Sequence, residues 1–191
     1  MDSHRCTLGG AIWINLANTI NKRRVDKLDE PASVMFWLQE NGLLRESDRL
    51  VLESEPRLLE VTEVLRSLRN LCLDVLSELE HEIAPTTVKR LHEIAENIQV
   101  RLTLSSSHGL LKLEHEGATT EDHLSYHVIS SMVQTLQTVP KERIRTCEHE
   151  ECILHFIDTS KSGRRRWCSM ETCGNRHKAA EFYARKKQKN G

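Results

Sequence analysis

The sequence predicts a mainly α-helical protein built from two parts. The larger part is a helical amino-terminal domain with one small β-hairpin, and the smaller is a carboxy-terminal unit made of a β-hairpin and a helix. Three observations support this division. Apolar residues recur at steps of three and four through most of residues 1–140, four of the six cysteines lie within residues 147–173, and the charge balance changes sign near residue 140. We therefore expect domains at 1–140 and 141–191.

Composition and charge narrow the class of protein. The 191 residues are 38% hydrophobic, enough for a sizeable core, and no segment has the pattern of a secretory signal or a membrane span. Residues 141–191 carry 13 Lys and Arg against 7 Asp and Glu, whereas residues 1–140 carry 14 against 21. A basic unit joined to an acidic body is the asymmetry expected when one part binds nucleic acid. No membrane partner is expected, and we predict a cytoplasmic protein.

The amino-terminal domain is predicted to consist of helices separated by clear stop signals. The first helix falls within residues 7–21 and is expected to begin near Ala11, because two glycines precede that residue. A second helix follows Pro31 and stops at Gly42, and Ser47 is expected to cap a third that ends at Leu52. The remaining helices are predicted at about 57–83, at 85–100, and between Thr119 or Thr120 and Pro140.

Two features interrupt this helical pattern. Residues 101–117 change to a period of two, with Leu102 and Leu104 before a Ser-Ser-Ser-His-Gly turn and Leu111 and Leu113 after it, which predicts a β-hairpin. Cys72 lies on the apolar face of the longest helix and is predicted to be a buried core residue rather than a metal ligand.

Three polar residues, Asn15, Asn18 and Thr19, stand within the otherwise apolar first helix. One interpretation places them at the exposed edge of the helix or in local hydrogen bonds. The other is that these residues, together with Trp13, line a binding pocket for a small-molecule effector. The sequence leaves both interpretations open.

The four carboxy-terminal cysteines have the spacing C-x4-C-x15-C-x4-C, at positions Cys147, Cys152, Cys168 and Cys173. Two close pairs at this separation can place four thiolates tetrahedrally, as in a closed structural zinc site. In a reducing cytoplasm such cysteines are metal ligands more often than disulfides, and thiolates suit zinc, so we expect one structural Zn²⁺. A strand at 153–158 is predicted to pair with 164–167, and a helix is predicted to start at the last cysteine. Together they predict a treble-clef-like zinc finger.

Basic residues surround these cysteines, and we predict that they bind nucleic acid. On the last helix, Lys178, Arg185 and Lys189 form a stripe that can face phosphates, while Ala179, Phe182 and Tyr183 share another side and are expected to pack on the finger. Asn175 or Arg176 could reach base edges. Arg164, Arg165 and Arg166 either contact DNA as well or only offset the charge of about −2 that four thiolates leave around one zinc ion.

Residues 145–187 resemble the CGNR zinc finger of bacterial proteins, named after the tetrapeptide at positions 173–176. The resemblance rests on both cysteine pairs, on Phe156, Asp158 and Ser160, on the Arg-Trp-Cys-Ser-Met run at 166–170, and on Lys178 and Arg185. Proteins of this family usually carry a helical ABATE domain upstream, and Asn18-Thr19 is similar to its opening motif. The resemblance implies a bacterial, zinc-binding regulator of stress-induced transcription with a sensory or regulatory helical domain.

Two function classes follow from these patterns. The first is a DNA-binding transcriptional regulator, associated with the nucleoid when bound to DNA, whose helical domain senses a ligand or forms a homodimer. The alternative is an adaptor whose zinc-stapled surface docks another protein without contacting DNA. We do not expect an enzyme, because the sequence has no phosphate-binding loop or nucleophile motif and a four-cysteine zinc site has no open position.

Overall fold

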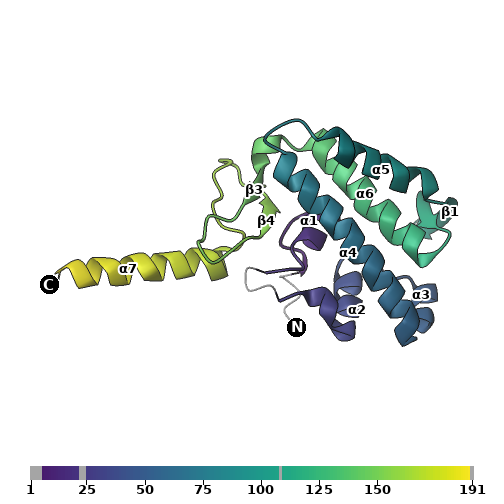
Figure 1. Ribbon diagram of the computed structural model, residues 1–191, viewed down its shortest axis with the longest axis horizontal. Coiled ribbons are helices and arrows are strands. Elements are labelled where there is room, and N and C mark those ends of the chain that lie inside the picture. Colours follow the sequence, from purple (N-terminus) through teal and green to yellow (C-terminus); the bar gives the residue numbers. More distant parts are fainter. Residues whose placement is uncertain (1–5, 22–24, 108, 190–191) are drawn as a thin grey trace.

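The computed structural model describes residues 6–21, 25–107 and 109–189, and of residues 107, 188 and 189 it describes the backbone alone. Its α-helices are α1 (Ile12–Ala17), α2 (Pro31–Glu40), α3 (Glu46–Leu52), α4 (Glu55–Glu78), α5 (Pro85–Asn97), α6 (Thr120–Thr138) and α7 (Asn175–Lys189). Its strands are β1 (Val100–Ser107), β2 (Leu110–Gly117), β3 (Ile144–Thr146) and β4 (His155–Ile157). Short helical turns are η2 (Lys27–Asp29), η3 (Lys141–Arg143) and η4 (Met170–Gly174). The predicted mainly helical fold class is confirmed (Figure 1).

The long helix α4 is the axis of the amino-terminal domain, and both α1 and α6 pack against it. Its buried apolar residues recur at helical spacing: Leu58, Val61, Leu65, Leu68, Leu71, Cys72, Val75 and Leu76. The helix ends at Glu78, earlier than the predicted end near residue 83. The Glu78 carboxylate accepts hydrogen bonds from the Ala84 N–H and the Thr87 hydroxyl, both at 2.9 Å, and so joins the end of α4 to the start of α5. The following Pro85 also favours the polyproline II conformation of Ala84, which has φ of −59° and ψ of 141°.

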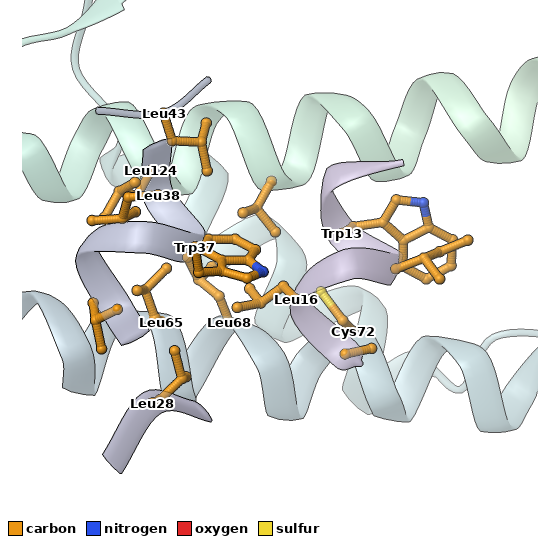
Figure 2. Close-up of a cluster of buried hydrophobic side chains, with 14 of the residues drawn as sticks. Trp13, Leu16, Leu28, Trp37, Leu38, Leu43, Leu65, Leu68, Cys72 and Leu124 are labelled. Carbon is orange, nitrogen blue, oxygen red and sulfur yellow. The ribbon is translucent and has the colours of Figure 1, made fainter. Parts of the chain in front are cut away.

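Two tryptophans fill the centre of this domain. Trp13 of α1 and Trp37 of α2 have no exposed surface, and Figure 2 shows Trp37 among Leu16 and Leu68. Burial of these large rings removes apolar surface from water and so stabilises the domain. Cys72 lies in the same core, as predicted, and burial raises the pKa of its thiol. This thiol therefore stays protonated.

The start of α3 differs from the prediction. The helix begins at Glu46, so Ser47 is inside its first turn and does not cap it. The N-cap residue is Arg45, whose N–H donates to the Asp48 carboxylate at 3.3 Å and whose guanidinium Nε donates to the same group at 2.7 Å. A buried carboxylate paired with arginine supplies the cap that a serine was expected to give.

The predicted hairpin and the last helix of the domain are confirmed. β1 and β2 pair antiparallel, and Gly109 in their tight loop has φ of 77°, which glycine adopts without strain. His108 of the predicted turn lies outside the described residues. Thr119 caps α6 by accepting from the Asp122 N–H at 3.0 Å, while the Asp122 carboxylate accepts from the Thr119 N–H at 3.3 Å.

The carboxy-terminal unit pairs its strands differently from the prediction. The predicted strand is present as β4, but its antiparallel partner is β3, so the predicted pairing with residues 164–167 is wrong. The second edge of β4 is taken by the amino-terminal domain, where the Ile157 N–H donates to the Gly9 carbonyl at 3.0 Å. The Asp158 carboxylate accepts from the Arg165 N–H at 2.9 Å, which turns the chain away from β4 at this point. Residues 164–167 consequently have no strand edge to join.

The last helix, α7, projects away from the rest of the molecule (Figure 1). The prediction that Phe182 and Tyr183 pack on the finger is wrong, because their side chains are 61% and 68% exposed. Ala179 is exposed as well. The small core of the finger is already filled by residues that precede α7, chiefly Phe156 and the cysteines, so its far turns have no apolar surface to cover.

A buried ion pair joins α4 to the residue before η2 and to the segment that follows α1. The Arg69 guanidinium donates to both carboxylate oxygens of Asp26 at 2.6 Å and to the Thr19 hydroxyl at 3.0 Å. The side chains of Arg69 and Asp26 are only 9% and 11% exposed. Although burial opposes ionisation, the hydrogen bonds from Arg69 hold the pKa of Asp26 below its usual value.

Within the described residues, no helix combines the length and the apolar character that crossing a bilayer requires.

We expect Arg69→Met to lower the free energy of unfolding by about 3 kcal/mol, because it leaves a buried carboxylate without its partner. The matched control is Arg66→Met on the same helix, whose ion pairs with Asp29 and Glu63 are exposed and whose loss should cost less than about 1 kcal/mol. Urea unfolding followed by circular dichroism measures both. Equal losses in the two variants would contradict a structural role for the Arg69 pair.

Candidate metal centre

The sulfur atoms of Cys147, Cys152, Cys168 and Cys173 all lie within 4.8 Å of one another. The Sγ atoms of Cys152 and Cys168 are 3.8 Å apart, and those of Cys168 and Cys173 are 3.7 Å apart. Four Zn–S bonds of about 2.3 Å directed to the corners of a tetrahedron separate the sulfur atoms by about 3.8 Å. The donor set therefore fits one structural zinc ion, as the spacing predicted. The protein therefore supplies all four ligands of the zinc ion.

Local contacts hold the two cysteine pairs in place. The Cys168 N–H donates to the Cys147 Sγ at 3.4 Å, a hydrogen bond that supports a thiolate at a metal. The Cys152 N–H donates to the His149 carbonyl at 2.8 Å and closes the first turn. Each pair thus presents its sulfur atoms from a tight, hydrogen-bonded loop.

The glycine after the last cysteine is required by space. A Cβ at Gly174 would lie 2.4 Å from the Met170 Sδ and 2.9 Å from the Trp167 ring. A larger residue here would have to displace the Met170 side chain and the Trp167 ring, so glycine allows this close packing within the finger. The turn itself is capped by Ser169, whose hydroxyl accepts from the Thr172 N–H at 3.3 Å.

Hydrogen bonds among the thiols of Cys147, Cys152 and Cys168 shift their pKa values. Hydrogen bonding with Cys152 and Cys168 lowers the pKa of Cys147, whereas hydrogen bonding with Cys147 raises the pKa of Cys152 to about 11 and raises that of Cys168 as well. A bound dication reverses this order, because it stabilises every thiolate and releases the remaining protons. The centre therefore suits a bound cation.

A buried carboxylate braces the loop between the two cysteine pairs. Asp158 is 2% exposed and accepts hydrogen bonds from the N–H groups of Ser160 and Arg165, both at 2.9 Å. Hydrogen bonding with Ser160, together with that from Arg165, lowers the pKa of Asp158 to about 2. Sequence reasoning assigned Asp158 no role, although an Asp two residues before a Ser is a common turn signal.

The second of the three consecutive arginines faces the finger itself. The Arg165 guanidinium donates to the Trp167 carbonyl at 2.9 Å and to the Cys168 carbonyl, and it lies 4.4 Å from the centre of the Phe156 ring. A cation above an aromatic face is attracted to it. Arg165 therefore stabilises the metal-binding loop from within.

Its two neighbours are exposed. The Arg166 Nε donates to the Glu148 carboxylate at 2.5 Å, and its guanidinium lies 4.5 Å from the Trp167 ring. Arg164 is exposed, and the three arginines line a shallow groove of about 330 Å³ together with Trp167 and Met170. Part of the positive charge here is thus balanced by a carboxylate rather than by zinc thiolates.

The remaining predicted nucleic-acid-binding residues lie along α7. Those with exposed side chains are Asn175, Arg176, Lys178 and Arg185, and the side chain of Lys189 lies outside the described residues. Arg185 pairs with Glu181 at 3.3 Å, as their spacing predicts. The structure places this basic set on the one helix that extends away from the acidic body (Figure 1).

The four residues predicted to bind a ligand have different surroundings. Trp13 is fully buried, and Asn15 donates to the Asn41 side-chain oxygen at 2.7 Å inside the domain. Asn18 and Thr19 reach a cleft of about 620 Å³ between the end of α1 and the finger. The cleft is also lined by Lys27, Cys152, Cys173 and Arg176. Ligand binding by the four residues stays a prediction.

Asn18 also has a role that the sequence did not suggest. Its side-chain amide donates to the His155 carbonyl at 2.8 Å, and its side-chain oxygen accepts from the His155 N–H at 2.9 Å. The carboxamide therefore pairs with β4 as a strand residue would. No local signal could have indicated this contact, because the two residues are 137 positions apart.

Comparison with known families covers both parts of the chain. Residues 143–186 match the family model described as "CGNR zinc finger", and residues 10–138 match the ABATE model, described as "Putative stress-induced transcription regulator". The resemblance seen in the sequence is thereby confirmed for both parts. Among curated proteins, none matches the chain.

We expect the purified chain to contain one zinc ion and Cys168→Ser to lose it, because three thiolates hold zinc less tightly than four. The control is Cys72→Ala, which removes a buried thiol of the helical core and should leave the metal content unchanged. Elemental analysis by mass spectrometry gives the zinc-to-protein ratio. A folded wild-type chain without metal would refute the assignment.

Asn18→Ala should loosen the finger, because it leaves the His155 N–H and carbonyl without partners at a cost of about 1–3 kcal/mol. Hydrogen exchange at the His155 amide should accelerate, and transfer of zinc to a chelator should become faster. The control Asn97→Ala removes an amide that bonds to the Glu93 carbonyl of its own helix, away from the finger. If both variants exchange His155 at the wild-type rate, the contact does not hold the finger.

Proposed function

The chain belongs to the ABATE family and carries a CGNR zinc finger, and from this premise we propose that it is a transcriptional regulator that binds DNA through its finger and α7. The observation that carries the proposal is the projecting basic helix. Residues 141–191 have 13 Lys and Arg against 7 Asp and Glu, and α7 carries much of this excess away from a body in which acidic residues prevail. Such a charge separation favours approach of a polyanion from the side of the finger.

The dimensions of α7 suit a groove of DNA. Its 15 residues extend about 22 Å at 1.5 Å per residue, and the major groove of about 12 Å width accepts a helix. In this arrangement Lys178, Arg185 and Lys189 contact phosphates, while Asn175 and Arg176 at the start of the helix reach base edges. Arg164 and Arg166 add phosphate contacts beside the helix. Arg165 keeps its contacts inside the finger.

The cleft beside α1 gives the helical domain a means of sensing. A small effector bound there would contact Asn18 and Thr19 on one side and Arg176 on the other. Asn18 is also hydrogen-bonded to β4, so a ligand that moves its carboxamide would change how the finger is held. The effector would act by favouring one of two finger positions.

A second candidate function has one observation in its favour. Phe182 and Tyr183 are exposed on α7, and exposed aromatic residues beside arginines are typical of protein-binding surfaces. In this version the finger is an adaptor that docks a protein without contacting DNA. Neither version is enzymatic, since four cysteine ligands leave zinc no position for a substrate. Both place the chain in a reducing cytoplasm, where its cysteines remain thiols or metal ligands.

The proposal is tested by measuring DNA affinity as a function of salt. Genomic DNA fragments labelled for fluorescence anisotropy should bind at about 50 mM salt, with a log–log slope of about 0.9 per phosphate contact. The double variant Lys178→Ala with Arg185→Ala should weaken binding and reduce this slope by about 1.8.

The matched control removes two cations from the helical body, Arg49→Ala with Lys89→Ala, whose side chains are 45% and 78% exposed. This variant should keep the wild-type slope. If the wild-type chain binds no DNA at about 50 mM salt, direct DNA contact is refuted. Recovery of a specific protein after nuclease treatment, lost when α7 is mutated, would then establish the adaptor.

A further inference from the structure

The β1–β2 hairpin carries an apolar face that no other described part of the chain covers. Cross-strand pairing places Leu104 opposite Leu113, with Leu102 and Leu111 on the same side of the hairpin. The exposed fraction of the side chain is 64% for Leu102, 72% for Leu104, 77% for Leu111 and 55% for Leu113. Soluble monomers rarely expose a contiguous apolar surface of this kind.

The attachment of the hairpin leaves this face accessible. The helical body holds the hairpin at its base, where the Gly117 carbonyl accepts from the Arg45 guanidinium at 2.7 Å and the His115 ring lies 5.4 Å from the Tyr126 ring of α6. The leucines lie farther along the strands. A two-stranded hairpin is marginally stable by itself in water, so a partner that covers one face would stabilise it considerably.

Charge indicates what kind of partner fits. The hairpin contains two cations and two carboxylates, Arg101, Lys112, Glu114 and Glu116, and is therefore neutral, whereas residues 1–140 as a whole carry 14 Lys and Arg against 21 Asp and Glu. Lys112 and Glu114 already pair with each other at 2.7 Å. A neutral surface does not attract nucleic acid or a highly charged protein. Two copies of the chain can approach each other through the neutral hairpin without the repulsion that the acidic remainder of residues 1–140 would cause.

We propose that two copies of the chain dimerise by packing these leucine faces against each other about a twofold axis. A flat apolar face is self-complementary under such an axis, and two β layers packed at about 10 Å bury their facing side chains. The contact is small, so the dissociation constant should be on the order of 10 µM. The hairpin and α7 lie at opposite ends of the molecule, so both copies of α7 stay accessible (Figure 1). This inference goes beyond DNA binding and does not depend on it.

Sedimentation velocity of the full chain tests the proposal. At about 200 µM the wild-type protein should sediment as a dimer of about 44 kDa, twice the 22.0 kDa chain, and dilution to about 1 µM should dissociate it. Leu104→Lys with Leu111→Lys should be monomeric throughout, because dimerisation would bury four ammonium groups.

The matched control adds the same two charges elsewhere. Leu50→Lys with Leu110→Lys changes one leucine of α3 and one on the opposite face of the hairpin, which are 77% and 74% exposed, and should dimerise like the wild type. A wild-type monomer at about 200 µM overturns the proposal and assigns the face to another partner. Dimerisation of the Leu104→Lys, Leu111→Lys variant overturns it too.

A measurement on the unmodified chain guards against misfolded variants. Hydrogen exchange of peptides from residues 100–117 should slow as the concentration rises from about 1 µM to about 200 µM, while peptides from α7 should exchange at an unchanged rate. Exchange of the hairpin that is independent of concentration would also overturn the proposal.

Discussion

The short strand β4 is hydrogen-bonded on both of its edges, and the position of the zinc finger depends on this. β3 occupies one edge, and the Gly9 carbonyl and the Asn18 carboxamide occupy the other. Backbone groups removed from water need partners, so the finger cannot turn against the helical domain without losing these bonds. The two parts of the chain therefore share a sheet edge although they are far apart in sequence. Any signal between them has a short path through α1.

The metal replaces a hydrophobic core in the carboxy-terminal unit. Apart from its cysteines, Phe156 is the one fully buried apolar residue of the described finger, which is too little apolar burial to hold about 45 residues together. Zinc, the buried Asp158 carboxylate and the Arg165 guanidinium supply the missing stability through directional bonds. The small size of this core also explains why α7 is exposed. With the small core already complete, only the first turns of the helix contact the finger, and the basic remainder extends into solvent.

Features that depend on neighbouring residues were predicted correctly from local sequence patterns. Apolar periodicity gave the helices, alternation gave the β1–β2 hairpin, and cysteine spacing gave a centre whose sulfur distances fit zinc. Three errors have nonlocal causes. The second edge of β4 is taken by Asn18, 137 residues from His155, and Glu78 at the end of α4 bonds to the start of α5. The exposure of Phe182 and Tyr183 depends on how little apolar surface the finger offers, which their helical spacing does not indicate.

The pairing of Asn18 with β4 limits how such proteins can be recombined. A finger separated from its helical domain would present the unpaired N–H and carbonyl of His155 and the unpaired N–H of Ile157 along one strand edge, a template for association with other chains. A finger grafted from a relative would need a strand whose backbone N–H and carbonyl groups can hydrogen-bond to the Asn18 carboxamide. The two parts are therefore expected to diversify together, each constrained by the shape of the other, rather than to be exchanged as independent modules.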